Sequence, residues 1–282
     1  MKTTQKLLGY VLPYLLALTV TPGCGPDRQA TAEQERKTEI AMKARALYEE
    51  KCKTVAKREI YRTVPDVEGI VLLKVRPVPG AKEWADLMWP GAVFADESYG
   101  DHYISTFLGY EYSSLPKGDW IKDRQLVPVS PTNRGYINTD RRPGGLAGYR
   151  YVDVIDEKDG KRYRYTARYD EPWRTDSSYS KSYVRFNLDK TPAPDPSPRY
   201  GVTFEDHVIP EERELGVASS TVKVIDLQSN EVLGELTRYA WGATKPSGAN
   251  PSPWLTAKKC PSGDGIGVEA TTRKFVDRRI QV

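Results

Sequence analysis

The densest group of ionisable side chains in the sequence is the run Glu205-Asp206-His207, which three more glutamates follow closely. A carboxylate beside a histidine could act as a general base or help to bind a cation. No nucleophile lies at a telling spacing from this run, and Pro210 marks a turn. The run is kept as a candidate site, but we expect a solvated acidic loop between two strands. The three further acids are Glu211, Glu212 and Glu214.

The common catalytic and cofactor motifs do not occur in the sequence. The chain has two histidines, His102 and His207, which excludes a three-histidine zinc site, and it has no HExxH motif. It has no GxSxG elbow and no GxxxxGKS/T phosphate loop. Gly263, Gly265 and Gly267 have the wrong spacing for a GxGxxG loop. The sequence therefore predicts no catalytic residue, no metal ligand and no cofactor.

Aromatic and basic side chains suggest two kinds of binding surface. The chain has 6 Trp and 18 Tyr, and several tryptophans near expected loops could stack on a glycan. These are Trp84, Trp89, Trp120 and Trp173. The doublets Arg141-Arg142 and Arg278-Arg279 could meet lipid head groups or an acidic partner. Aromatic side chains in β-rich proteins are more often core, and isolated basic doublets more often lie in solvent, so neither surface is the primary expectation.

The first 23 residues have the layout of a bacterial export signal. Lys2 and Lys6 precede an apolar run from about residue 7 to residue 20, and a short polar stretch ends at Cys24. The apolar run is too short for a membrane span, which needs roughly 20 residues, and Pro13 would break a spanning helix. We predict that residues 1–23 are a signal peptide.

The sequence Thr21-Pro22-Gly23-Cys24 resembles the lipobox of bacterial lipoproteins. The resemblance implies that Cys24 becomes the new N-terminus and carries acyl chains, which would anchor the protein to a membrane. Gly25 after the cysteine implies sorting to the outer membrane, facing the periplasm. The alternative is cleavage near Gly23 and ordinary secretion, which would leave a periplasmic or secreted protein.

If Cys24 is acylated, Cys52 and Cys260 remain as an even pair in an oxidising compartment. We predict a disulfide between them, which would stabilise the fold by up to about 5 kcal/mol on the chain-entropy view. The alternative is two buried free thiols.

Composition bounds the partners and the core. The net charge is +4, and removing residues 1–23 takes away two lysines and no acid, so the exported chain is close to neutral. Such a chain is not expected to bind nucleic acid. The apolar fraction of 39% includes the 18 tyrosines, which predicts a thin, aromatic core of the kind found in β-rich proteins.

One helix is expected near the N-terminus, after a short polar tether at residues 24–30. Residues 32–56 lack Gly and Pro and are rich in helix formers, and Thr31 with Gln34 fits a capping box. Apolar residues recur every three or four positions, which predicts one buried stripe. Its members are Ile40, Ala44, Leu47, Tyr48, Cys52 and Val55.

The rest of the chain suggests strands and hairpins. Asp159-Gly160 predicts a hairpin turn, after which four tyrosine or alanine side chains should face the core while the alternate arginines face water. Residues 113–148 read as long loops and residues 82–89 as a short helical turn. The expected hairpins cover residues 149–155 with 162–169 and residues 215–227 with 231–241. Further strands are expected at residues 59–64, 69–76, 102–112, 177–187 and 269–282.

These elements predict an α+β fold that is mainly antiparallel β, as a sheet, sandwich or open barrel, with one N-terminal amphipathic helix. We expect a single domain over residues 31–282. The proline-rich stretch 190–199 is a candidate internal boundary.

Three segments resemble a family of uncharacterised proteobacterial lipoproteins: Cys52-Lys53-Thr54-Val55, residues 60–70 and residues 214–235. The resemblance implies no assigned activity and no site. We therefore expect a non-enzymatic envelope lipoprotein that binds or scaffolds an envelope protein or a glycan. The alternative is a periplasmic enzyme or glycan-binding protein whose site the sequence does not reveal.

Overall fold

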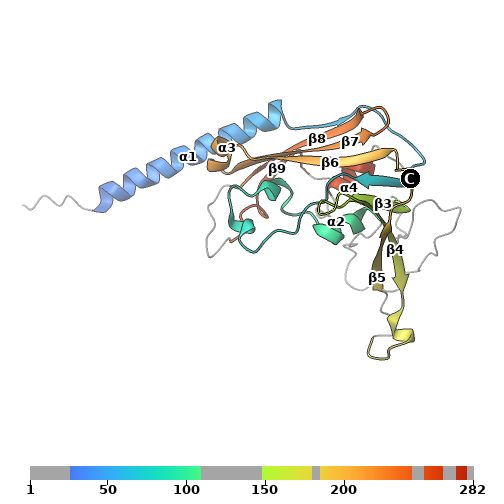
Figure 1. The fold of residues 1–282 in the computed structure, drawn as a ribbon. Helices are drawn as coiled ribbons and strands as arrows, with labels where there is room; N and C mark the ends of the chain where they lie inside the picture. The colour runs from blue at the N-terminus through green and yellow to red at the C-terminus, as the bar shows by residue number, and fades with distance from the viewer. Residues whose placement is uncertain (1–25, 109–147, 180–184, 243–250, 263–270, 278–282) are drawn as a thin grey trace, which may run out of the picture. The chain divides into compact units, whose positions relative to one another are not determined.

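The computed structural model describes residues 26–108, 148–179, 185–242, 251–262 and 271–277 (Figure 1). The chain divides between Glu39 and Ile40 into two units, and helix α1 runs across this division. The helices are α1 (Pro26–Thr54), η1 (Glu83–Ala85), η2 (Pro90–Phe94), α2 (Gly100–Phe107), η3 (Pro172–Arg174), α3 (Pro210–Glu214) and α4 (Thr271–Asp277). The strands are β1 (Lys57–Ile60), β2 (Gly69–Leu72), β3 (Tyr151–Ile155), β4 (Arg162–Asp170), β5 (Arg185–Pro192), β6 (Tyr200–His207), β7 (Val217–Asp226), β8 (Glu231–Trp241) and β9 (Lys258–Cys260).

The strands form one nine-stranded open sheet in the order β1-β8-β7-β6-β2-β3-β4-β5, with β9 also paired to β8. Strand β2 runs parallel to its neighbours β3 and β6, and the other pairs are antiparallel. The expected α+β class with a mainly antiparallel sheet is therefore confirmed, and the sheet is not closed into a barrel.

Both expected hairpins are present. β3 and β4 pair antiparallel across a turn in which Gly160 has a φ of +68°. β7 and β8 pair along nearly their whole length, and Asn230 in their turn has a φ of +57°. A left-handed backbone suits Gly and Asn, so both turns carry residue types that hairpin turns favour.

The main core covers one face of the sheet. Ala218 and Val222 of β7 contribute to it, together with Phe94 of η2, Phe107 of α2 and Phe275 of α4, and all are buried. Figure 1 shows α2 and α4 on the same side of the strands. Burial on this face explains why the central strands carry many valines.

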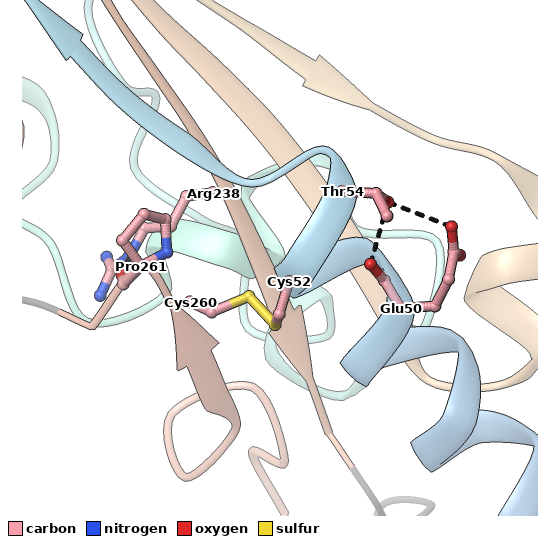
Figure 2. Close-up of a disulfide and its surroundings, with 6 residues drawn as sticks. All are labelled: Glu50, Cys52, Thr54, Arg238, Cys260 and Pro261. Atoms are coloured by element: carbon pink, nitrogen blue, oxygen red, sulfur yellow. Dashed lines mark hydrogen bonds between the residues drawn. A yellow bond between two sulfur atoms is a disulfide. The ribbon is translucent and has the colours of Figure 1, made fainter.

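A smaller cluster lies on the opposite face. Tyr48 of α1 packs there with Val217 and Tyr239, which alternate with residues of the main core. The predicted disulfide joins Cys52 to Cys260, tying the last turns of α1 to β9 (Figure 2). The expected stripe on α1 is buried in its middle, whereas its two ends, Ile40 and Val55, are exposed.

Several expectations about the helices and strands were wrong. Helix α1 begins at Pro26, so Thr31 and Gln34 lie inside it and form no capping box, and residues 26–30 of the expected tether are helical. Residues 100–107 and 271–277 are the helices α2 and α4, where strands were expected. In α2 every residue from Tyr103 to Phe107 is buried, and a short continuous buried run does not separate helix from strand by its spacing.

The proline-rich stretch 190–199 does not separate two units. It starts inside β5 and leads to β6 of the same sheet, and the residues from Ile40 onward form one unit. The signal segment with Cys24, the expected loops over 113–147, Trp120 and the two arginine doublets lie outside the described residues.

Candidate functional site

The candidate run at residues 205–207 lies in strand β6, not in a loop. Successive side chains of a strand point to opposite faces, so the strand separates the members of the run. Asp206 faces the main core and hydrogen-bonds to Ser220, whereas His207 contacts Thr221 on the other face. Glu205 shares the His207 face, with 4.0 Å between its Oε1 and the Nδ1 of His207.

His207 begins a row of polar side chains that crosses three strands. Its Nε2 lies 3.1 Å from Thr221 Oγ1, which lies 3.1 Å from Thr237 Oγ1 on β8. Thr237 in turn donates to Glu235 Oε1 over 3.3 Å, and Lys57 of β1 holds the same carboxylate oxygen at 3.1 Å.

The direction of this row decides what His207 can do. An ionised carboxylate accepts hydrogen bonds only, so the hydroxyl proton of Thr237 points to Glu235. Thr237 must then accept from Thr221, and Thr221 must accept from His207. The Nε2 atom of His207 is therefore a proton donor here. A base that activates Thr221 as a nucleophile would need the reverse direction, so this geometry does not form a catalytic triad.

Asp206 belongs to a buried charge network that the sequence did not reveal. Arg76, which follows β2, places its guanidinium carbon 3.9 Å from the ring centre of Phe94 and 4.1 Å from that of Phe204. Its Nε donates to Glu97 over 2.7 Å, and its Nη1 lies 3.4 Å from Asp206 Oδ1. No local pattern could signal this network because its members are far apart in the sequence.

Glu97 also fixes helix α4. The backbone N–H and the hydroxyl of Thr272 donate to its two oxygens over 2.6 and 2.7 Å. Burial disfavours the charged form of Arg76, but Glu97 and the other nearby acidic groups outweigh it and raise the pKa of Arg76. Three donors on one carboxylate and a stacked guanidinium describe a network that holds segments together. Nε and Nη1 of Arg76 are engaged in it, whereas the buried Nη2 atom has no hydrogen-bond partner among the described residues.

The other acids of the cluster are not brought together. Glu211 and Glu214 are exposed on α3, while Glu212 is buried and pairs with Lys51 of α1 at 3.1 Å. Arg213 is fully buried and donates to the carbonyl oxygens of Trp89 and His207. Burial lowers the pKa of Arg213 to about 10. Within the described ranges, no three His, Cys, Asp or Glu side chains are placed to hold a metal ion.

The tryptophans do not form an exposed platform in the part of the chain that is described. Trp84 and Trp89 pack on each other with ring centres 5.1 Å apart, and both contact Tyr99. Trp89 is buried in the main core, and Trp84 packs against that core. Trp173 lies partly buried in η3.

The arginines of β4 were expected in water, and for two of them this was wrong. Arg164 donates to both oxygens of Asp153 over 2.8 and 3.1 Å, and Arg162 lies 3.3 Å from the same carboxylate. The side chain of Asp153 is fully buried, so these two arginines cover an acid on β3. Further along, Arg168 pairs with Asp189 and Arg185 pairs with Asp170 across the β4–β5 hairpin.

Comparison with known proteins adds no assignment. No family model matches the chain, and neither a curated protein nor a solved structure matches it. Among the described helices, none has the length and apolar character needed to cross a bilayer.

Proposed function

We propose that this chain is an envelope lipoprotein, anchored through Cys24 and facing the periplasm, that acts as a non-enzymatic binding or scaffolding module. The observation that carries the proposal is the Cys52–Cys260 disulfide. Structural disulfides form and persist in oxidising compartments and are rare in the cytosol. The disulfide is thus what an exported chain would use.

The state of the ionisable groups supports a non-enzymatic role. Catalytic acids and bases must exchange protons with a substrate, and so they need an accessible group in the right protonation state. In this chain His207 donates to Thr221, and Glu97 accepts from three donors in the core. The two oxygens of Glu97 and the Nε2 atom of His207 are thus already engaged within the fold, and the Nδ1 atom of His207 faces the exposed Glu205.

The first part of α1 suits a chain that begins at a lipid anchor. Residues 29–43 are exposed, and Ala44 is the first buried residue among those of α1 whose exposure is described. Helix formers and ion pairs such as Lys37 with Glu33 keep this stretch helical and polar. We infer that it is an aqueous spacer between the acylated Cys24 and the folded unit.

Expression of the full-length chain in a Gram-negative host tests the proposal. We expect the protein in the membrane fraction, with an N-terminal peptide whose mass shows an acylated Cys24. The Cys24→Ser variant should lose the acyl mass and leave the membrane fraction. In both, Cys52 and Cys260 should resist alkylation until a reductant is added. Recovery of the intact chain from the cytosol, with Met1 present and both thiols labelled, would refute the proposal.

A further inference from the structure

The β4–β5 hairpin extends beyond the rest of the sheet. β3 pairs with β4 only at residues 162–165, whereas β5 pairs with β4 as far as Asp170. The pairs beyond β3 therefore form a two-stranded overhang of roughly 17 Å at 3.4 Å per residue. Figure 1 shows β4 and β5 running away from β3 toward η3. Two-stranded ribbons are marginal in water, so an overhang of this kind gains from a further strand.

The outer edge of β5 offers backbone groups for such a strand. The amide of Ala193 donates to the carbonyl of Arg162, which marks that position as a hydrogen-bonded pair of the antiparallel ladder. Such pairs alternate along the ladder, so odd-numbered residues of β5 bond to β4. Residues 186, 188 and 190 then direct their N–H and C=O groups outward. In the described part of the sheet, β5 is a terminal strand.

We propose that this edge pairs antiparallel with β5 of a second copy of the chain, about a two-fold axis at Asn187. This register sets Arg185 opposite Asp189 of the partner subunit, and the symmetry repeats the pair. Odd-numbered residues then meet as non-hydrogen-bonded pairs, in which side chains lie closest. Two salt bridges on one face thus specify the register.

The charges already on this face fit that arrangement. The side chains of Arg185 and Asp189 are each 43% exposed, so both can be reached from outside. Arg185 pairs with Asp170 and Asp189 pairs with Arg168 within the hairpin. Joining two copies would extend these pairs into a row of alternating charge. The neighbouring allowed register, about Leu188, would set Arg185 opposite a threonine and form no charge pair.

Charged residues and Pro192 at an edge can also prevent pairing. That protection works by opposing like charges, whereas the Asn187 register opposes unlike charges. Pro192 has no N–H and therefore ends the new ladder rather than blocking its centre. A single short ladder is smaller than a standard protein interface, so the association should be weak and concentration-dependent. It needs no lipid anchor and can be tested apart from the proposed function.

Cysteine cross-linking tests the register in the full chain carrying Cys24→Ser. Across the axis, two Asn187 Cα atoms should lie about 4.5 Å apart, within the range of a disulfide. Asn187→Cys should therefore give an intermolecular disulfide on mild oxidation. The matched control is Thr191→Cys, on the same face of β5, whose two copies would lie roughly 27 Å apart. Dimer from Asn187→Cys and not from the control supports the proposal. Absence of dimer overturns the proposal and indicates that another segment or partner covers β5. Equal dimer from both variants also overturns it, because it indicates cross-linking by random collision.

Charge reversal separates the contact between copies from the pairs inside each hairpin. In the Asn187→Cys background, Arg185→Asp should abolish the cross-link. Adding Asp189→Arg should restore it, because the reversed charges again face each other across the axis. Inside each hairpin, the double variant keeps like charges beside Asp170 and Arg168, so the fold stays weakened. Failure of the double variant to recover the cross-link would overturn the proposed register.

Discussion

The buried charge network around Arg76 and the ion pairs of the β4–β5 hairpin are both made of arginine and carboxylate side chains, but their exposure to solvent differs. In the first, the side chains of Arg76 and Glu97 are 2% and 1% exposed. In the second, those of Arg168 and Asp189 are 55% and 43% exposed. Two intermediate cases have a fully buried acid whose arginine reaches water to differing degrees. At Asp153 the side chains of Arg162 and Arg164 are 17% and 19% exposed. At Asp226 those of Arg62 and Arg199 are 42% and 46% exposed.

This gradient indicates what each acid does for the fold. When a carboxylate is removed, a partly exposed arginine can turn to solvent, but a fully buried one remains as an unpaired charge in the core. The loss of stability should therefore follow the exposure of the arginine more closely than the exposure of the acid.

The largest effect is expected at Glu97. Glu97→Ala leaves Arg76 buried without its main counter-ion and removes both acceptors of Thr272. We expect a loss of about 3–5 kcal/mol in the free energy of unfolding, measured by urea titration with tryptophan fluorescence.

A double variant shows whether that loss comes from the stranded charge. Arg76→Met with Glu97→Met removes both charges, and replacing a whole buried ion pair by apolar residues is often tolerated. The double variant should be more stable than Glu97→Ala. Equal or lower stability would show that the ion pair itself, and not the unpaired arginine, accounts for the cost.

The second-largest loss of stability is expected at Asp153 of β3, the strand with which the β4–β5 hairpin pairs. Asp153→Ala removes the hydrogen bonds from Arg162 and Arg164, but both guanidinium groups lie close enough to the surface to regain water. We expect a loss of about 1–3 kcal/mol, from the same urea titration. A loss as large as that of Glu97→Ala would contradict the gradient.

The sequence predicted the parts of this molecule that are set by local patterns. The hairpins followed from Asp159-Gly160 and from alternating residues, and the Cys52–Cys260 disulfide followed from counting cysteines. It failed for α2 and α4, where short runs of β-branched and aromatic residues looked like strands and were too continuously buried for their spacing to indicate a helix. Packing against the sheet outweighed the strand propensity there.

The charge networks could not be predicted because they join distant segments. Arg76 meets Glu97 across a segment that contains η1 and η2, and Thr272 comes from near the far end of the chain. Arg162 and Arg164 were assigned to solvent because alternation predicts the face of the sheet on which a side chain lies. It does not predict which side chains of neighbouring strands lie on the same face. Asp153 on the neighbouring strand shares it, and its burial depends on the register between β3 and β4.

Asp226 should reveal its contribution through pH. Hydrogen bonds from Arg199 are the main cause that lowers the pKa of Asp226 well below its usual range, and the amide of Gln228 adds to it. Because the pKa of Asp226 is lower in the folded state than in the unfolded state, where it is near 3.9, ionised Asp226 stabilises the fold above that pH. This stability is lost as the pH falls through and below that value. The urea midpoint of the wild type should therefore fall more steeply between about pH 5 and pH 3 than that of Asp226→Asn. Asp195→Asn removes an exposed carboxylate that pairs with Arg162 at 2.7 Å and serves as the control for the loss of one surface charge.

The smallest effect on stability is expected at Asp189, where both partners reach water. Asp189→Asn should change the free energy of unfolding by less than about 1 kcal/mol, because exposed pairs gain little and pay side-chain entropy. Added salt should remove even that difference, since it screens exposed charges. The same substitution should nevertheless reduce cross-linking of Asn187→Cys strongly, because the proposed two-fold pairing uses Asp189 twice. A large loss of stability would contradict the gradient, because Asp189 would then behave like a buried acid. Unchanged cross-linking would contradict the proposed pairing of two β5 strands.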